Sequence, residues 1–216
     1  MQRRKRLSLS TDLIVPVAHI VPCTEAEGPG KRFALWFQGC PLRCPGCCNP
    51  EMLPFEGGTP TPLSEIVQRM VAAQEREQIE GITLLGGEPL AHACAGSELA
   101  RAARERGLSV MVFSGYTLEE ARELLDPAVA ELLALTDILV DGRYERELPD
   151  TERRWIGSTN QRIHFLTDRY LADDPCWNKK NTLEIRLDAN GLALNGFPAQ
   201  IAVGLWKELP RKRTKK

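Results

Sequence analysis

Short apolar segments alternate with helix-like segments through the middle of the chain, and this alternation restricts the fold more than any other feature. Strands that alternate with helices of this length pair in parallel and are joined by right-handed crossovers. We therefore expect an α/β fold with an open sheet of about five or six mostly parallel strands. Ser64 is expected to cap the first helix of this region. The other expected helices cover 97–105 and 117–135, and the expected strands are 14–21, 33–37, 82–90, 108–113 and 137–142.

The C-terminal part of the chain has a different pattern. Residues 145–160 are polar and poor in strand-forming residues, which predicts a long functional or mobile loop, and the apolar stretch 161–167 follows it. From 182 to 197, apolar and polar residues alternate on both sides of an Asn-Gly pair, which predicts an antiparallel hairpin. We therefore divide the chain into a basic tail (1–12), a core domain (13–172), a C-terminal hairpin extension (173–206) and a second basic tail (207–216).

Composition and charge narrow the functional classes. The chain of 216 residues is 43% hydrophobic and 26% charged, as in ordinary soluble proteins, and no apolar run approaches the roughly 20 residues that span a bilayer. The basic N-terminus lacks the apolar core of a secretory signal, so a cytoplasmic location is expected. The net charge is −1, although residues 1–10 carry +4 and residues 207–216 carry +5. We interpret both tails as solvated ends, and we expect no membrane or nucleic-acid partner.

Four of the seven cysteines lie within nine positions, on a loop that follows the expected strand 33–37. Cys40, Cys44 and Cys47 form a C-x3-C-x2-C pattern, and Cys48 follows directly. An odd cysteine count in a chain without a secretory signal argues against a disulfide framework. The loop therefore predicts metal or redox chemistry.

Two kinds of metal site compete for these thiols. A structural zinc ion needs four ligands, and Cys48 is expected to be a poor fourth ligand because neighbouring side chains on an extended segment point in opposite directions. Zinc would have to recruit Cys23, Cys94, Cys176 or a histidine. Three thiolates on a short loop suit a 4Fe-4S cluster better, with three irons held by the protein and the fourth left open for a ligand.

Two motifs together make the chain resemble a known superfamily. The C-x3-C-x2-C loop after one strand and GGEP (86–89) at the end of the next resemble the radical S-adenosylmethionine (SAM) superfamily, which implies an open, partial (β/α) barrel. The stretch GPGKRFALWFQGCPLRCPGCCNP (28–50) is similar to glycyl-radical activating enzymes. SGYTLEE, LVDGRY and GSTNQRI extend the likeness to the activating proteins of anaerobic ribonucleotide reductases, over about residues 14–167.

The resemblance implies the chemistry of the site. Cys40, Cys44 and Cys47 would ligate the cluster, and SAM would occupy the fourth iron. An electron from a donor such as flavodoxin or ferredoxin would cleave SAM to methionine and a 5'-deoxyadenosyl radical. That radical would take a hydrogen atom from a glycyl-radical enzyme partner, such as anaerobic ribonucleotide reductase. The resemblance assigns no catalytic residue beyond the cluster ligands.

Glycines are expected where the backbone approaches the cofactors. Amide groups in the turn around Pro45 and Gly46 can bond to cluster sulfurs, which changes the cluster potential. Gly86 and Gly87 give the strand end the freedom for a tight turn. The resemblance implies that this turn binds the SAM ammonium group, and that Glu88 shapes it.

Further polar residues follow the strands. The resemblance implies that Ser114 and Asp141 lie near the carboxylate and ribose of SAM, although capping or turn formation is an equally good interpretation. Beside Cys47, Cys48 stands where the family commonly has Tyr or His, so adenine recognition is left to backbone contacts. We interpret Cys48 as a spare thiol next to the cofactor, and the histidines and tryptophans as structural residues.

Two other functions stay open. A radical SAM maturase that acts on another peptide or on a small molecule would use the same two cofactors. A non-catalytic iron-sulfur or zinc protein would instead use four protein ligands and would bind no SAM.

Overall fold

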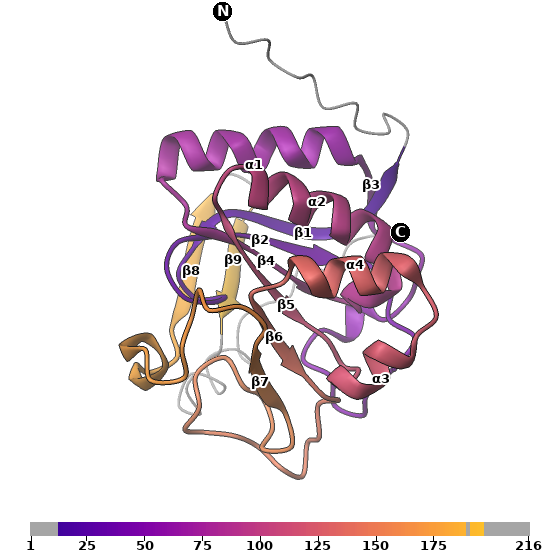
Figure 1. The fold of residues 1–216 in the computed structure, drawn as a ribbon, viewed down its shortest axis with the longest axis vertical. Helices are drawn as coiled ribbons and strands as arrows, with labels where there is room; N and C mark the ends of the chain where they lie inside the picture. Colours follow the sequence, from indigo (N-terminus) through magenta and orange to yellow (C-terminus); the bar gives the residue numbers. More distant parts are fainter. Residues whose placement is uncertain (1–12, 189–190, 197–216) are drawn as a thin grey trace, which may run out of the picture.

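A seven-stranded mixed sheet with helices on one face forms the body of the protein, and a two-stranded hairpin follows it (Figure 1). The computed structural model describes residues 13–188 and 191–196. Both expected basic tails lie outside the described residues, as does the expected hairpin extension beyond residue 196.

The elements come in the order that the alternation predicts. The helices are α1 (Leu63–Glu77), α2 (Ala93–Glu105), α3 (Leu118–Glu123) and α4 (Pro127–Leu135), with short 3-10 helices η1 (Pro50–Met52), η2 (Pro89–His92) and η3 (Pro175–Asn178). The strands of the sheet are β1 (Ile14–Thr24), β2 (Arg32–Phe37), β3 (Thr59–Pro62), β4 (Gly81–Gly86), β5 (Ser109–Phe113), β6 (Ile138–Asp141) and β7 (Arg162–Phe165). The hairpin consists of β8 (Leu183–Asp188) and β9 (Gly191–Gly196).

The sheet is parallel only in its centre. The strand order is β3-β1-β2-β4-β5-β6-β7, and β2, β4, β5 and β6 pair in parallel. β1 pairs antiparallel with β2 and β3, and β7 pairs antiparallel with β6. The expectation of mostly parallel strands is therefore wrong at both edges. The loop from β1 to β2 is too short for a crossover, and the proline-rich β3 lies at an edge, where prolines remove no ladder hydrogen bond.

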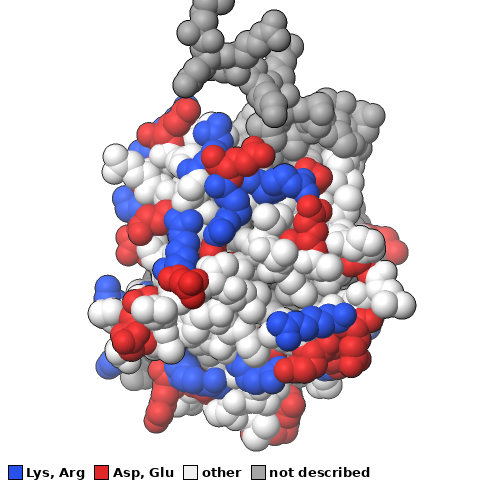
Figure 2. Space-filling model, viewed as in Figure 1, with Lys and Arg blue, Asp and Glu red and all other residues white. Residues whose placement is uncertain are grey.

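Both faces of the central strands are buried. β2 is buried along its whole length, and its side chains alternate between the two faces. Phe33, Leu35 and Phe37 belong to the large core that includes residues of all four helices. Ala34 and Trp36 belong to a smaller cluster on the opposite face. The outer surfaces of α1 and α2 are charged, as the upper part of Figure 2 shows, while the middle of that view is largely uncharged.

The segment 145–160 contains no helix and no strand of the sheet, as its polarity predicts, but part of it packs against the body of the protein. Trp155 is 1% exposed, and its indole N–H donates a hydrogen bond to the Ala26 carbonyl at 3.1 Å. Its ring meets that of Trp177 edge-on, with centroids 5.3 Å apart. The segment therefore closes the face of the sheet opposite the helices. The structural interpretation of the tryptophans is confirmed for Trp36 and Trp155, which are both buried.

Two helices begin earlier than expected. Ser64 does not cap α1, because Pro62 occupies the cap position and Ser64 already lies in the first turn. The first amide of α1, that of Leu63, instead donates to the Leu13 carbonyl at 3.0 Å. α2 begins at Ala93 rather than near residue 97, because η2 leads directly into it.

The expected hairpin is confirmed, and polar side chains attach it to the body. β8 and β9 pair antiparallel, with Leu183 opposite Gly196. Glu184 accepts a hydrogen bond from the Glu25 amide at 2.8 Å, and Asn195 donates to the Thr24 hydroxyl at 2.9 Å. In the described ranges, no helix is both long and apolar enough to cross a membrane.

Candidate functional site

Four loops meet at the carboxyl ends of the parallel strands. They are the cysteine loop after β2 (38–49), the GGEP turn after β4 (86–89), the SGY loop after β5 (114–116) and the DGRY loop after β6 (141–144). Ligand sites of open parallel sheets form at this edge. The four segments are those that the sequence singled out, and the fold brings them together.

The GGEP turn is fastened to the start of the cysteine loop. The Gly87 amide donates to the Phe37 carbonyl at 2.8 Å, and the Glu88 amide donates to the Gly39 carbonyl at 3.0 Å. A Cβ atom on Gly87 would collide with the Gly39 backbone, and Gly86 has a φ of 106°. Both glycines are therefore needed for the close approach of the two loops.

The three pattern cysteines lie on a loop that is turned rather than extended. The Cys47 amide donates to the Cys44 carbonyl at 3.1 Å, across a turn in which Gly46 has a φ of 76°. Cys40 is buried, Cys44 and Cys47 are partly buried, and Cys48 is exposed. The thiols of the loop therefore differ in burial, from buried Cys40 to exposed Cys48, at the edge of the sheet.

Backbone amides donate hydrogen bonds to the cysteine sulfurs, an arrangement that tunes the potential of iron-sulfur clusters. Burial raises the pKa of the Cys40 thiol, and the N–H groups of Leu42 and Arg43 partly oppose this by donating to its sulfur. Burial also raises the pKa of Cys44, whose sulfur accepts from the Tyr144 amide. The sequence placed amide donors to cluster sulfurs around Pro45 and Gly46, whereas the amides that donate to the Cys40 and Cys44 sulfurs are those of Leu42, Arg43 and Tyr144. The donor from the DGRY loop is visible only in the tertiary structure.

Cys47 and Cys48 do not point in opposite directions, so that expectation is wrong. Their side chains share a hydrogen bond, which lowers the pKa of Cys47 to about 6 and raises the pKa of Cys48 well above its ordinary value. A further amide, that of Asn49, also donates to the Cys47 sulfur. The reason is local, because the chain bends at Cys48 instead of continuing as a strand.

The donor set fits a cluster better than a single ion. Among the described residues, no three histidine, cysteine or acidic side chains stand close enough together to hold one metal ion. A tetrahedral zinc site requires such a close group, whereas each protein sulfur of a 4Fe-4S cluster binds a different iron. The charges of Cys40 and Cys47 both raise the pKa of Cys44, so the three thiols act on one another electrostatically. Cys40, Cys44 and Cys47 would hold the cluster.

Glu88 joins the GGEP turn to the SGY loop. Its carboxylate is 1% exposed and accepts hydrogen bonds from the Ser114 hydroxyl at 2.9 Å, the Gly115 amide at 2.8 Å and the Leu90 amide at 2.9 Å. Burial raises the pKa of Glu88 to about 7, although these bonds favour the charged form. The sequence indicated both Glu88 and Ser114, but it gave no sign of their direct contact.

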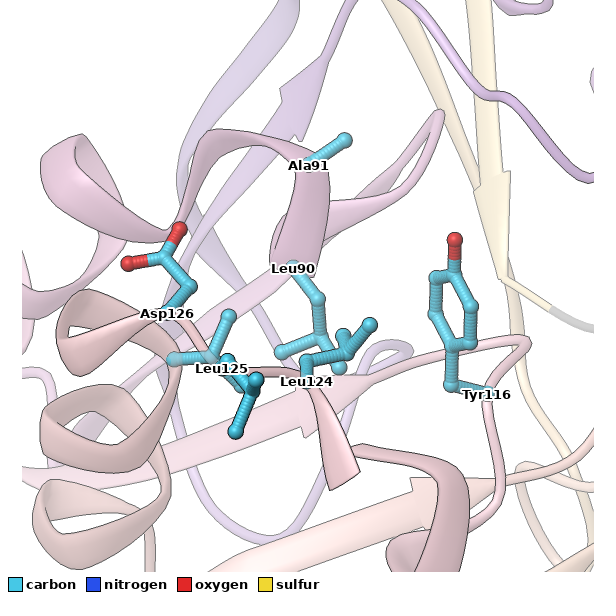
Figure 3. A pocket seen from close by; sticks show the side chains of 7 residues that line it. Leu90, Ala91, Tyr116, Leu124, Leu125 and Asp126 are labelled. Atoms are coloured by element: carbon cyan, nitrogen blue, oxygen red, sulfur yellow. The ribbon is translucent and has the colours of Figure 1, made fainter. Parts of the chain in front are cut away.

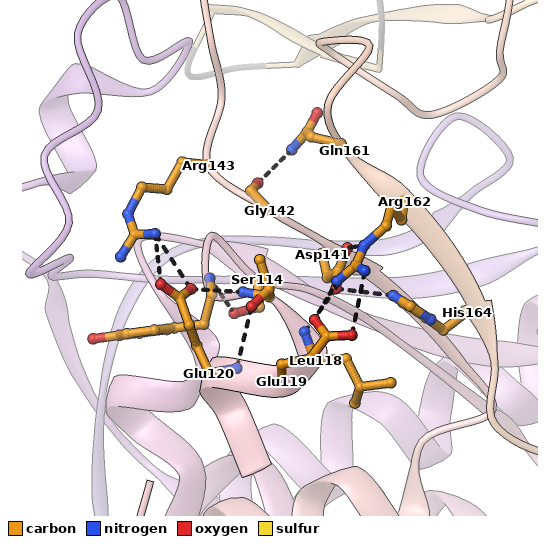
Figure 4. Close-up of polar contacts among 12 residues, drawn as sticks. Ser114, Leu118, Glu119, Glu120, Asp141, Gly142, Arg143, Gln161, Arg162 and His164 are labelled. Carbon is orange, nitrogen blue, oxygen red and sulfur yellow. Dashed lines mark hydrogen bonds and ion pairs between the residues drawn. The ribbon is translucent and has the colours of Figure 1, made fainter. Parts of the chain in front are cut away.

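Asp141 is the centre of a second polar network, shown in Figure 4. Its fully buried carboxylate accepts hydrogen bonds from the Arg162 guanidinium at 2.6 and 3.1 Å and from the Leu118 amide at 2.7 Å. A ring nitrogen of His164 lies 2.8 Å from the same carboxylate. Burial alone would raise the pKa of Asp141, but these partners outweigh it and the pKa is lowered. The structural interpretation of His164 agrees with this contact. Arg162 was missed, because nothing in QRIHF marks it as a partner of a residue 21 positions earlier.

Arg143 and Arg146 flank the cysteine loop from the DGRY side. Arg143 forms an ion pair with Glu120 at 2.9 Å (Figure 4), and its guanidinium lies 5.9 Å from the centre of the Tyr116 ring. A Cβ atom on Gly46 would lie 3.1 Å from the Arg146 Nε atom, so this side chain packs on the turn between Cys44 and Cys47. The sequence motifs gave no role to either arginine, and a local signal exists for Arg143 alone, which directly follows the strand-end pair Asp141-Gly142.

Comparison with known proteins agrees with this geometry. The model of the 4Fe-4S single cluster domain family matches residues 26–164. A protein of Enterobacteria phage T4, named anaerobic ribonucleoside-triphosphate reductase-activating protein, is 32% identical over 160 residues, which are 72% of this chain and 97% of that protein. Proteins of the same name from Salmonella typhi (33% over 151 residues) and Escherichia coli K12 (32% over 152 residues) are matched over 67% of this chain and 95% of their own length. The chain therefore belongs to the 4Fe-4S single cluster domain family and to the family of anaerobic ribonucleoside-triphosphate reductase-activating proteins.

Proposed function

We propose that the chain installs a glycyl radical on an anaerobic ribonucleoside-triphosphate reductase. The observation that carries the proposal is the cysteine loop, whose three thiols have C-x3-C-x2-C spacing and which packs against three further strand-end loops. The chain belongs to a family of reductase-activating proteins. The cofactors of this activity are a 4Fe-4S cluster and SAM.

When bound, the cluster and SAM would supply one-electron reductive cleavage of SAM, with the electron taken from an external donor, and so the means to remove a hydrogen atom from the partner's glycine. The chain's own residues position these groups. Cys40, Cys44 and Cys47 bind three irons, and the amides of Leu42 and Tyr144 donate to sulfurs of this set. Such amide bonds stabilise negative charge on a cluster and so shift its potential.

The SAM side of the site comprises Gly46, Cys47, Cys48, Gly86, Gly87, Glu88, Ser114 and Asp141. Glu88 and Asp141 are already bonded to protein partners, and this supports a role in fixing the SGY and DGRY loops at the cofactor. Carbonyl groups of the GGEP turn would bind the SAM ammonium group, and the two glycines let this turn pack directly against the cysteine loop. Cys48, which is exposed beside Cys47, supplies a small thiol at the expected adenine position.

The wider architecture follows from the same proposal. The sheet is the open, partial (β/α) barrel of a radical SAM core over residues 13–172, and residues 173–206 are an extension of it. The reductase reaches the cluster through the open side. The protein works in the cytoplasm, and a flavodoxin or ferredoxin supplies its electron. Support for the extension comes from the family model, which ends at residue 164, before the hairpin.

The test is anaerobic reconstitution followed by incubation with dithionite, SAM and purified reductase from the same organism. We expect 5'-deoxyadenosine and a glycyl radical signal on the reductase in electron paramagnetic resonance. The Cys44→Ala variant is the matched control and should give neither. If 5'-deoxyadenosine forms but the reductase never gains a radical, the maturase alternative replaces this function. A loaded cluster without any 5'-deoxyadenosine would leave only the non-catalytic alternative.

A further inference from the structure

An apolar pocket lies beside the SGY loop, among the elements of the helical layer (Figure 3). Its volume is about 450 Å³, a size that accepts a small ligand or a few side chains of another protein. The residues that line it come from η2, the SGY loop, the α3–α4 turn and α4, and include Leu90, Tyr116, Leu124, Leu125, Asp126 and Val129.

The apolar surface of the pocket extends to a fully exposed leucine. Leu90 and Val129 are buried and form its floor. Leu125, in the turn between α3 and α4, is 101% exposed. Because the Leu125 side chain is fully exposed, it contributes nothing to the hydrophobic core or to folding stability. Leu125 thus extends the apolar lining of the pocket to the molecular surface, where a partner can reach it.

The rim of the pocket carries an excess of negative charge. Glu119 and Glu120 of α3 are neutralised by ion pairs with Arg162 and Arg143. The remaining charged residues between 118 and 127 are Arg122, Glu123 and Asp126, which leave one net negative charge. In the part of the chain that the structure describes, no ion pair involves Asp126, which lines the pocket and whose carboxylate accepts from the Ala128 amide (Figure 3). A basic side chain on a partner would complement it.

The pocket is continuous with the cysteine loop. Tyr116 lines the pocket and also belongs to the SGY loop. A Cβ atom on its neighbour Gly115 would lie 2.5 Å from Leu42, which comes from the cysteine loop, so the two loops are in close contact. Glu88 links the two loops further, because its carboxylate accepts from the Gly115 amide and its own amide donates to the Gly39 carbonyl. A chain seated in the pocket is therefore next to the candidate cluster site.

We propose that this pocket receives an apolar side chain of the anaerobic ribonucleoside-triphosphate reductase, from a segment that also carries a lysine or arginine opposite Asp126. The inference rests on the proposed function and adds where the partner docks. The apolar anchor supplies affinity, and the charge pair fixes orientation. Docking on the helical side leaves the cysteine loop free to meet the glycine-bearing loop of the reductase.

The test uses two variants of the full chain with a reconstituted cluster. Leu125→Arg replaces a fully exposed side chain, so it loses no core packing, but it removes part of the apolar lining that receives the anchor and repels a basic partner. Asp126→Asn removes the charge and keeps the cap of α4, because the Asp126 carboxylate accepts from the Ala128 amide and asparagine caps equally well. Leu171→Ser is the matched control, since Leu171 is also exposed (54%) but lies in the loop between β7 and η3.

Binding to purified reductase is measured anaerobically at low and at high salt. Leu125→Arg should raise the Kd at least about tenfold. Asp126→Asn should raise it about two- to fivefold at low salt and have little effect at high salt. Leu171→Ser should match the wild type. Iron content and 5'-deoxyadenosine formation without reductase should be equal in all four proteins.

A Kd for Leu125→Arg within about twofold of the wild type would overturn the docking site. The proposed function fails in a different way. In that case the wild-type chain yields no glycyl radical on the reductase, whatever the effect of Leu125→Arg on binding.

Discussion

Glu88 offers a quantitative test of how the site is held together. Its carboxylate is 1% exposed, and burial raises its pKa from 4.5 to about 7. Between these values the folded chain keeps a proton that the unfolded chain has lost. The resulting stability is fully present below pH 4.5 and is lost as the pH rises through about 7.

The magnitude follows from the shift. At about 1.4 kcal/mol for each pKa unit, ionising Glu88 costs the folded state about 3 kcal/mol at alkaline pH. From about pH 5.5 to about pH 8 the loss is about 2 kcal/mol. The Glu88→Gln variant cannot ionise, so it should lack this loss. Its amide nitrogen would face the Gly115 N–H, which lowers stability by about 1–2 kcal/mol equally at both pH values.

The assay is urea unfolding of the cluster-free chain in reducing buffer, followed by tryptophan fluorescence at the two pH values. We expect the free energy of unfolding to fall more steeply with pH in the wild type than in Glu88→Gln, by about 2 kcal/mol. Glu27→Gln is a second test of the same reasoning, because Glu27 is also buried with a pKa raised to about 8, so its replacement should likewise reduce the fall of stability with pH. Parallel pH curves for the wild type and Glu88→Gln would refute the reasoning.

Three other replacements test separate parts of the site and fold. Cys48→Ser should retain the iron content and visible absorbance that Cys44→Ala loses, and loss in both variants would make Cys48 a ligand. Asp141→Asn should lower the free energy of unfolding by about 2–3 kcal/mol, because Arg162 and His164 lose a buried charged acceptor; urea unfolding with no measurable change would contradict this. Trp155→Ala should lower the free energy of unfolding by about 3–5 kcal/mol, and a smaller loss would mean that the packing of the segment 145–160 on the sheet contributes little stability.

The part of the fold that local patterns control was predictable. The central strands and the four helices follow from the alternation of apolar and helical segments, and the hairpin follows from the alternation around its Asn-Gly turn. β3 was missed because a TPTP segment forms a strand only when an existing edge, here β1, is available to pair with it. The burial of Trp155 agrees with its structural interpretation, but its contact with the Ala26 carbonyl was missed, since Ala26 lies 129 residues away.

The sequence by itself determined which loops matter. Two features can be read directly from the sequence: the spacing of Cys40, Cys44 and Cys47, and the position of GGEP after a strand. Parallel strands bring the loops that follow them to one edge of the sheet. The tertiary structure decided what holds these loops in place. Glu88 bonds to Ser114, and Asp141 bonds to Arg162, across separations of 26 and 21 residues. No local pattern encodes these contacts, because a buried carboxylate takes whichever donors the packing of distant segments brings to it.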